Sequence, residues 1–600
     1  MKAILTLFFL LFGTLAYSQE NPDIIFDKTI SYKLKDKGKG KYELSSYTEV
    51  SRIVLSERAA EVRHFYTSEP YYVSVSKLKS KCGKKSSDYF YHDTNEREFI
   101  SANKQRVLYF SDRINVGDTI KYSYKKKYID PAYIPITIIP NSNYVRRFSL
   151  IFEHPKAVTV DFEFFFPRGE IPFRLERLEK KTTLEFDSLG HYDDLPYFAY
   201  DYFIAAILTT FKKDSLAINP TSVKDFVAWF NNEIKVDAIL DTMVVDFIPD
   251  SVKSDSDKLS YIYNFVRDSI RYLFIDEGGH SFLPHDPDSV IRLKYGDCKD
   301  KAYLMLAMAA QAGIKLSLVA TTSEPNSPFD GVNIGMYNHV ICCYENDGEC
   351  HFYDPTARPS SYEHIMELLI GHDALIIDTE NPRKIRIPET TEIPAINVDI
   401  NAHIDSLDRG TAIITCRGEF QQNVIKALGD LIDNDLELYL AELISKQLYK
   451  TQLSNFTPVA FAEDAAVLMA EVNLSEFIIQ SNEKKYVPQS AFIAQYSGVL
   501  ERLVDSLHIY FKSRMELNMQ LSLTAPGFKG HDDSTVVGDK FTGYYSACFH
   551  AGDSSIFIFD YTFMRPKKFM EGSIRNAYLE FYREYKVVRP KLFVLERTEL

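Results

Sequence analysis

The stretch at residues 295–313 constrains the fold more than any other part of the chain. It opens with the run Tyr295-Gly296-Asp297-Cys298-Lys299-Asp300-Lys301-Ala302. Good helix formers follow as far as Gly313, a usual stopping residue. Gly296 supplies a turn and Asp297 is a suitable N-cap, so the sequence predicts a buried helix with Cys298 in its first turn. The unpaired N–H groups and the dipole at such a helix start favour a thiolate over a thiol.

Two candidate partners for this thiol follow in a predicted β-hairpin. His339 opens one apolar run and Asp354 closes the next, with Asp347-Gly348 between them as a strong turn signal. A two-residue turn at Asp347-Gly348 places His339 diagonal to Asp354 on one face, and a turn one residue earlier places them directly opposite. A three-residue loop places them on opposite faces. With an even loop, Cys298, His339 and Asp354 supply a nucleophile, a base and an orienting carboxylate.

These motifs resemble the bacterial transglutaminase-like domains, which have a papain-like fold. The resemblance rests on Gly-Asp-Cys-Lys-Asp-Lys-Ala at a helix start, Asn-His-Val at residues 338–340 and Tyr-Asp-Pro-Thr-Ala at residues 353–357. It implies that Cys298, His339 and Asp354 are catalytic residues of a cysteine enzyme. Because the superfamily contains acyltransferases, peptidases, amidases and inactive members, the resemblance leaves the substrate open.

One position departs from that family. Many relatives carry a glutamine just before Pro-His upstream of the cysteine, where it helps the backbone N–H of the cysteine to hold an oxyanion. This chain has Leu283 at that position, with His280, Ser281 and His285 as candidate substitutes. Losing one oxyanion donor costs about 10²–10³ in rate, so Leu283 predicts slower catalysis without affecting the fold.

The length of 600 residues predicts several domains. We expect a signal peptide at residues 1–18, a β-rich N-terminal domain at 19–215, a transglutaminase-like catalytic domain at 216–381, a proline-punctuated linker at 382–395 and an α+β C-terminal domain at 396–600. The expected fold class is α+β, with β-sandwich-like domains on both sides of the papain-like domain. The run from Gly117 to Tyr124, placed after a leader, resembles the domain of unknown function DUF3857 that often precedes transglutaminase-like domains.

Local patterns predict further elements outside the site. Apolar spacing predicts helices at residues 221–233, 256–270 and 573–585, and one long helix or two helices at 420–448. Residues 323–337 are rich in glycine, asparagine and proline, which predicts a mobile loop beside the site.

The first residues predict export. Lys2 precedes an apolar run at residues 3–15, and Ala16-Tyr17-Ser18 offers small residues for cleavage before Gln19. We therefore expect a periplasmic or secreted protein of a Gram-negative bacterium. No later run approaches the ~20 apolar residues of a membrane span, so we expect no integral membrane segment after cleavage.

Charge and cysteine content exclude some partners and leave others open. The net charge of −14 argues against nucleic-acid binding, which requires a basic face. Seven cysteines are too few for a disulfide framework. A Cys343–Cys350 disulfide and a zinc site of Cys342, Cys343, Cys350 and His351 are the alternatives to free thiols, but adjacent cysteines on a strand face opposite ways. We expect neither a metal nor another cofactor.

Two functions follow from these observations. The first is an exported cysteine enzyme acting on amide bonds of peptides or proteins, those of the cell envelope included, as a peptidase, amidase or acyltransferase. Hydrolysis needs no second-substrate site and is the simpler of these reactions. The alternative is a non-catalytic binding or assembly protein that uses the same fold as a scaffold. Leu283 favours this alternative, and the complete Cys298–His339–Asp354 set opposes it.

Overall fold

A computed structural model describes the chain from residue 24 to residue 598 with internal gaps. The residues that it leaves out are 70–71, 86, 94–98, 102–103, 141–143, 168–169, 190–204, 235–247, 250, 277–282, 325, 347, 357–364, 391, 404–408, 432, 463, 482, 493–507, 512–513, 552–554, 568 and 589–590. The expected signal peptide and its cleavage site therefore lie outside the described residues. In the part that is described, strands outweigh helices.

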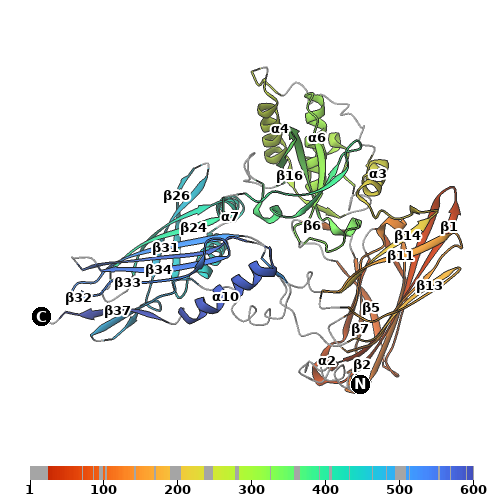
Figure 1. Ribbon diagram of the computed structural model, residues 1–600, viewed down its shortest axis with the longest axis horizontal. Helices are drawn as coiled ribbons and strands as arrows, with labels where there is room; N and C mark the ends of the chain where they lie inside the picture. The colour runs from red at the N-terminus through yellow and green to blue at the C-terminus, as the bar shows by residue number, and fades with distance from the viewer. Residues whose placement is uncertain are drawn as a thin grey trace, which may run out of the picture.

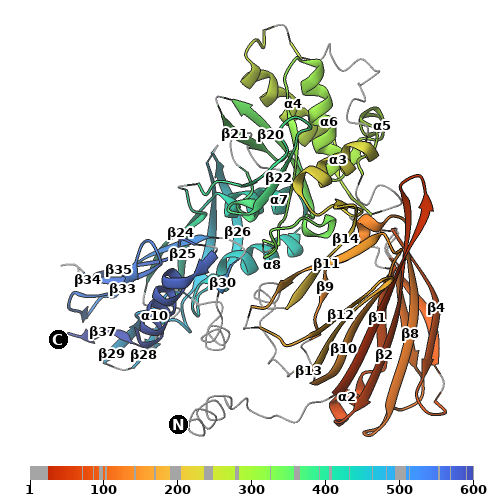
Figure 2. The ribbon, with the colours of Figure 1, turned by 45° about the vertical axis from the view of Figure 1, so that its right-hand side comes forward.

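A large sheet of seven strands dominates the N-terminal region (Figure 2). Neighbouring strands run antiparallel, except that β1 and β10 are parallel. In sheet order, the strands are β12 (Arg174–Leu178), β13 (Lys181–Leu189), β10 (Tyr144–Glu153), β1 (Ile24–Gly38), β2 (Lys41–Val54), β8 (Thr119–Tyr128) and β4 (Val73–Lys81). Alternate residues point to one face, so Phe148, Leu150 and Phe152 of β10 are all buried on the inner side.

Two smaller sheets lie against this large sheet. The first consists of β11 (Val158–Phe165), β14 (Ala206–Lys213), β15 (Leu216–Ala217) and, paired with β14, β9 (Thr137–Ile138). The second consists of β3 (His64–Glu69), β7 (Lys104–Phe110) and β5 (Ser87–Asp93), near the short helix α2 (Glu57–Glu61). The first shares an extensive apolar core with the inner face of the seven-stranded sheet, and the second encloses a separate small core around Phe65 and Phe110.

The central region packs helices on a five-stranded sheet (Figure 1). The sheet order is β21 (Glu349–Tyr353), β20 (His339–Asn346), β19 (Ser317–Thr321), β22 (Asp373–Ile377) and β23 (Arg383–Arg386). Helix α6 (Cys298–Gln311) lies against β20 and β19 on one side and α4 (Asp255–Ser269) on the other, which explains why it is buried nearly all round. Helices α3 (Val223–Ile234) and α4 confirm the predicted helices within two residues at each end.

The C-terminal region is built on an eight-stranded sheet. Its order is β26 (Gln452–Phe461), β27 (Ala465–Asn473), β25 (Arg409–Arg417), β24 (Ala395–His403), β31 (Met515–Thr524), β35 (Ile556–Arg565), β34 (Gly543–Ala551) and β33 (Asp533–Asp539). One face packs on α7 (Glu419–Asp430), α8 (Asp433–Ile444), α10 (Gly572–Val588) and a small sheet that contains β29 (Lys484–Pro488) and β37 (Leu592–Arg597). The sequence predicts a sandwich-like domain here. In the structure, three helices and a small sheet cover this face of the eight-stranded sheet. Of the two alternatives predicted at residues 420–448, one long helix or two helices, the structure has two, α7 and α8.

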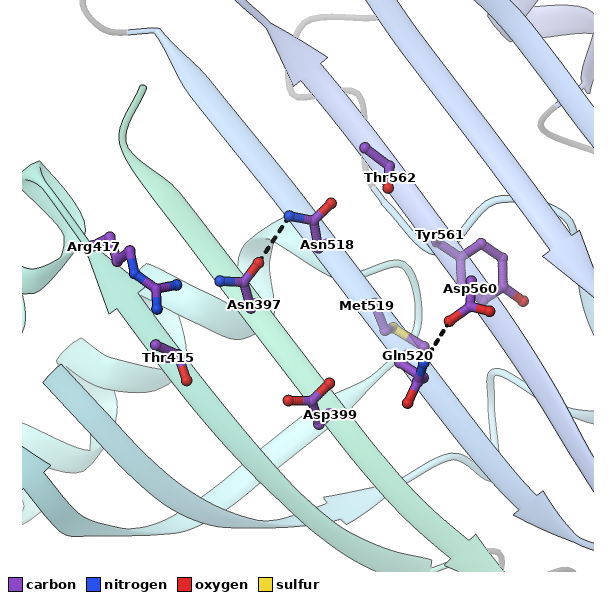
Figure 3. A pocket seen from close by; sticks show the side chains of 10 residues that line it. All are labelled: Asn397, Asp399, Thr415, Arg417, Asn518, Met519, Gln520, Asp560, Tyr561 and Thr562. Atoms are coloured by element: carbon purple, nitrogen blue, oxygen red, sulfur yellow. Dashed lines mark hydrogen bonds between the residues drawn. The ribbon is translucent and has the colours of Figure 1, made fainter. Parts of the chain in front are cut away.

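The opposite face of the eight-stranded sheet is polar. A hollow of about 440 Å³ on it is lined mainly by amide, hydroxyl and carboxylate side chains of β24, β25, β31 and β35 (Figure 3). Asn518 donates to Asn397 at 2.8 Å, and Gln520 donates to Asp560 at 2.7 Å.

The N-terminal and central regions are packed as one body. A single apolar core includes Phe148 and Leu150 of the large sheet together with Leu304 and Met305 of α6. Side-chain packing therefore continues across the domain boundary that the sequence predicts near residue 215. Strand β6 (Phe99–Ser101) also pairs in parallel with β17 (Phe274–Asp276), which follows α4.

The segment at residues 323–337 is packed and ordered by neighbours, in contrast to the mobile loop that its composition predicts. Phe329, Val332 and Ile334 are buried, and Asn333 donates to the Ile134 carbonyl at 3.0 Å. In the described part of the chain, no helix combines the length and the apolar character that a membrane span requires.

Candidate functional site

The site is organised around the start of α6. Asp297 caps the helix: its side chain accepts from the Asp300 amide, and the Asp300 side chain accepts from the Asp297 amide at 3.1 Å. A Cβ on Gly296 would lie 2.7 Å from Cβ of Asp300, so only glycine fits where the chain turns into the helix. This capping box holds Cys298 in the first helical turn, as the sequence predicts, and the thiol is 7% exposed.

Charged side chains around Cys298 tie the helix to its neighbours. Lys301 is buried and donates to the Ile270 and Arg267 carbonyls at the end of α4, at 2.8 and 3.2 Å. Lys299 pairs with Asp297. Burial raises the pKa of the Asp297 carboxyl to about 6, although the Lys299 ammonium opposes that shift.

His285 anchors the segment that precedes the helix. Its amide donates to Asp300 at 2.7 Å, and its Nδ1 lies 3.2 Å from the same carboxylate. The hydrogen bond with Asp300 raises the pKa of His285. Leu283, two residues earlier, is half-buried and brings no amide to the site. Of the candidate substitutes, His280 and Ser281 lie outside the described residues, and His285 is bound to Asp300.

The hairpin has the register that aligns the two partners. Cys342 lies opposite Tyr353 and Asn346 opposite Glu349, so two residues, 347 and 348, separate the paired strands. This even loop, at the first of the two predicted turn positions, makes His339 diagonal to Asp354 on one face.

The imidazole of His339 joins the thiol to the carboxylate. Nε2 of His339 lies 2.9 Å from Oδ2 of Asp354, and the same ring interacts with the Cys298 side chain. Because Nε2 faces the carboxylate, Nδ1 is the nitrogen left for the thiol. Burial by itself lowers the pKa of His339, but the charge and hydrogen bond of Asp354 and the contact with Cys298 outweigh it and raise that pKa well above its usual range.

Asp354 is held in its charged form. The side chain is almost fully buried and accepts at Oδ1 from the amide of Thr356 at 3.0 Å and from its hydroxyl. Burial raises the pKa of Asp354, but His339 and Thr356 together bring it below its usual value. The hydroxyl of Tyr263 on α4 donates to the Asp354 carbonyl at 3.1 Å, which fixes the backbone at the end of β21.

Tyr272 is a member of the site that sequence reasoning missed. Its strand β16 (Arg271–Tyr272) pairs in parallel with β18 (Tyr295–Gly296), so Tyr272 lies beside Gly296, two residues from the thiol. Tyr272 keeps 38% of its surface exposed, and its partial burial, reinforced by the acidic groups of Cys298, Asp297 and Asp354, raises the pKa of the phenol. No motif marks the tyrosine, because only the pairing of two distant segments brings it to the thiol.

The other cysteines take structural positions. All seven thiols are free. Cys342 packs into the core beneath α6, whereas Cys343 packs into a separate cluster on the far face of the sheet. Cys343 lies opposite Phe352 and Cys350 opposite Glu345, so the register does not pair the two cysteines directly. Among the described residues, no three His, Cys, Asp or Glu side chains gather as a metal-binding group.

Comparisons with known proteins support the central domain. A model of the transglutaminase-like superfamily matches residues 244–352, which include Cys298 and His339 and end two residues before Asp354. No curated protein matches the chain.

Among solved structures, one from Parabacteroides distasonis, named a "putative protease", is similar over 96% of this chain and 99% of its own, with a TM-score of 0.55 and 12% identity. An M1 zinc metallopeptidase from Deinococcus radiodurans matches 42% of this chain and 54% of its own, with a TM-score of 0.18 and 9% identity. At such identity, the first match shows a shared fold alone. The low TM-score of the second match does not indicate a shared fold. The chain therefore carries a transglutaminase-like domain at residues 244–352, within an overall fold that it shares with the Parabacteroides protein.

Proposed function

We propose that this protein is an exported cysteine enzyme that cleaves or transfers acyl groups at amide bonds of peptides or proteins. Cys298 is the nucleophile, His339 the general acid and base, and Asp354 the group that orients the imidazole. The observation that carries the proposal is the 2.9 Å contact between His339 and Asp354, with the Cys298 side chain at the same imidazole.

The proposed reaction has two steps. The Cys298 sulfur bonds to the carbonyl carbon, and the electron pair of the C=O bond moves to the oxygen. When the oxyanion collapses, the C–N bond breaks and the His339 imidazolium gives its proton to the leaving amine, which leaves a thioester on Cys298. Water in a hydrolase, or an amine in an acyltransferase, then attacks the thioester while neutral His339 takes its proton. The C–S bond breaks, which releases the acid or the new amide and restores the Cys298 thiolate beside the His339 imidazolium.

The surroundings supply two further features of this chemistry. The raised pKa of His339 favours the imidazolium beside the sulfur. The backbone N–H groups at the start of α6 offer a positive potential for the oxyanion. Since Leu283 adds no side-chain donor, we expect a modest turnover.

The experiment measures the two possible reactions of the thioester, hydrolysis and transfer to an amine. Full-length protein is incubated with fluorescein-labelled casein to follow hydrolysis, and with casein plus monodansylcadaverine to follow amine incorporation. Wild type should show at least one activity, and Cys298→Ala should abolish it. Cys82→Ala, which removes a buried thiol of the N-terminal region, should change neither activity.

The non-catalytic scaffold is the second candidate, and Leu283 favours it. Under that function, Cys298 alkylates slowly with iodoacetamide at neutral pH, and His339→Ala leaves the rate unchanged. The enzyme function instead requires fast labelling of Cys298 that moves toward alkaline pH in His339→Ala. Slow labelling of wild type, together with no turnover in either assay, would reject the enzyme and leave the scaffold.

We also propose that the protein reaches the periplasm or the exterior, and that residues 19–215 form a DUF3857-type, sandwich-like domain. The leader pattern at residues 1–18 supports export. The turn at Gly117, with a positive φ of 92°, followed by β8 supports the domain assignment. N-terminal sequencing of the mature protein should find Gln19 first, and an intact Met1 would reject export through this leader.

A further inference from the structure

Three cationic side chains lie on the inner face of the seven-stranded N-terminal sheet. Lys28 of β1 shares its face with Tyr32, which is buried and stacks on Phe152 in the core. Arg52 of β2 is diagonal to Lys28, since Arg52 pairs with Phe26 of β1. Lys126 of β8 points the same way, because it lies opposite Ser46, which lies opposite Tyr32. We call Lys28, Arg52 and Lys126 the inner cation cluster.

Aromatic rings line this cluster. Lys28 Nζ is 5.9 Å from the centre of Phe148, and Lys126 Nζ is 5.8 Å from the centre of Tyr124. The guanidinium of Arg52 lies over three rings, with distances to the ring centres of 5.3 Å for Phe26, 5.0 Å for Phe65 and 6.0 Å for Tyr122. The cluster therefore sits where the large apolar core around Phe148 and the small core around Phe65 approach each other.

The cluster has no counter-charge of its own. Within the described part of the chain, no carboxylate forms an ion pair with Lys28, Arg52 or Lys126. The charge of Glu69 does act on Lys126, but that carboxylate already accepts from Arg106 at 2.6 Å and from the Val75 amide at 2.8 Å. Nε of Arg52 is buried, and none of the described residues accepts a hydrogen bond from it.

The cations affect one another. Burial lowers the pKa of Lys126 to about 8, and the neighbouring Lys28 contributes to that shift. Burial and the charge of Arg52 lower the pKa of Lys28. Half-burying like charges without an anion costs free energy, and the contacts with aromatic rings offset only part of that cost. A fold stabilised for its own sake would place apolar side chains at these positions.

We propose that the inner cation cluster is a binding site for an amphipathic anion, a molecule that joins a carboxylate or similar acidic group to an apolar body. The two ammonium groups and the guanidinium receive the acidic group, and Arg52 Nε gains the acceptor that it lacks. Phe26, Phe65, Tyr122, Tyr124 and Phe148 contact the apolar body. Each of the three cations is only half-buried, so solutes can reach it.

The amphipathic character follows from the lining. A small inorganic anion would use the cations but not the five rings around them, and a neutral lipid would use the rings but leave the cations unpaired. A long-chain carboxylate satisfies both sets of groups, and it can come from a free fatty acid or from a larger acidic lipid.

The test uses full-length protein with Cys298→Ala, so that the result is independent of the proposed enzymatic activity. Binding of decanoate is measured by calorimetry, with decyltrimethylammonium as the probe of reversed charge and the same chain length. We expect decanoate to bind, and each of Lys28→Met, Arg52→Met and Lys126→Met to weaken that binding about tenfold or more. The matched control is Lys33→Met, an exposed residue of β1 on the opposite face of the sheet, which should leave the affinity unchanged.

Thermal unfolding without decanoate separates a binding site from a structural role. If the cations serve a ligand, Lys28→Met and Lys126→Met keep or raise the Tm, because they remove unpaired buried charge. Any of four results would overturn the proposal: no binding of decanoate, equal binding of decyltrimethylammonium, unchanged affinity in the three methionine variants, or a fall in Tm in both lysine variants. Decanoate should raise the Tm of the Cys298→Ala parent and not that of the methionine variants.

Discussion

The buried carboxylate of Asp354 determines the charge state of the proposed base. His339 is protected from water, and burial alone would favour its neutral form. The Asp354 charge, itself held by Thr356, reverses that preference. The Asp354 carboxylate, together with the contact to Cys298, therefore favours the imidazolium over the imidazole.

We predict that Asp354→Asn lowers the pKa of His339, the usual effect of removing an adjacent opposite charge. The raised pKa contributes stability that is complete below pH ~6.5 and is lost as the pH rises through the folded-state pKa of His339. In the variant this loss, and the alkaline limb of kcat/KM, should move to lower pH. The measurements are a pH–rate profile and urea unfolding at several pH values.

Asp378→Asn is the control for this prediction. It removes a carboxylate that pairs with Lys315 just beyond the end of β22. The residue of β22 that aligns with His339, across β19, is Ala374 at the other end of that strand. Its alkaline limb should coincide with that of wild type. An unchanged limb in Asp354→Asn would mean that Asp354 does not control the imidazole.

At the scale of elements, the segment that leads into His339 is held by the N-terminal region. The amides of Asp330 and Gly331 donate to the Glu163 carboxylate of β11 at 2.7 and 3.2 Å. A Cβ on Gly331 would lie 2.7 Å from the Leu208 side chain, so a glycine is needed for this close approach. The β-sheet of one region thereby determines the path of a loop that ends at the proposed base in another.

We predict that Glu163→Ala loosens this segment. Two backbone amides lose a charged acceptor, and each such bond contributes about 1.5–3 kcal/mol. Hydrogen exchange of the peptide covering residues 326–338 should accelerate roughly tenfold or more. Glu153→Ala, which removes an exposed partner of Lys33 on β10, should leave that exchange unchanged. Equal exchange in the two variants would show that the loop holds its conformation without Glu163.

At the scale of the whole molecule, one buried ion pair connects the central and C-terminal regions. Arg514 donates through Nε and Nη2 to both carboxylate oxygens of Glu367, at 2.8 Å each, and both side chains are 4% exposed. Arg514 also donates to the Thr390 and Glu392 carbonyls of the predicted linker. One guanidinium therefore binds the central region and the linker together.

We predict that Arg514→Met lowers the free energy of unfolding by about 3–5 kcal/mol, because it leaves the Glu367 charge buried and unpaired. Adding Glu367→Gln should restore part of the loss, since the orphaned charge is removed. The matched control is Lys567→Met, which breaks an exposed pair with Glu389 of the same linker and should cost about 0–1 kcal/mol. Chemical denaturation of the four proteins measures these differences. Equal losses for Arg514→Met and Lys567→Met would refute the role of burial.

The sequence by itself determined the features that depend on neighbouring residues. Gly296, Asp297 and Asp300 interact within one helical turn, so the start of α6 and the place of Cys298 could be read directly. Side chains alternate between the two faces of a hairpin. Whether His339 and Asp354 share a face therefore depends only on whether the loop has an even or an odd number of residues. Helices α3, α4 and α10 follow from apolar spacing in the same way.

The tertiary structure alone decided the features that join distant parts of the chain. Tyr272 beside Gly296, Glu163 beneath Asp330, and Arg514 on Glu367 each pair residues that local spacing does not relate. Lys28, Arg52 and Lys126 read as ordinary solvated strand residues until the register of β1, β2 and β8 places them on the inner face. The physical reason is that the spacing of apolar residues shows only which face of a helix or strand a residue occupies. Which other element packs against that face is decided by the packing of the whole chain.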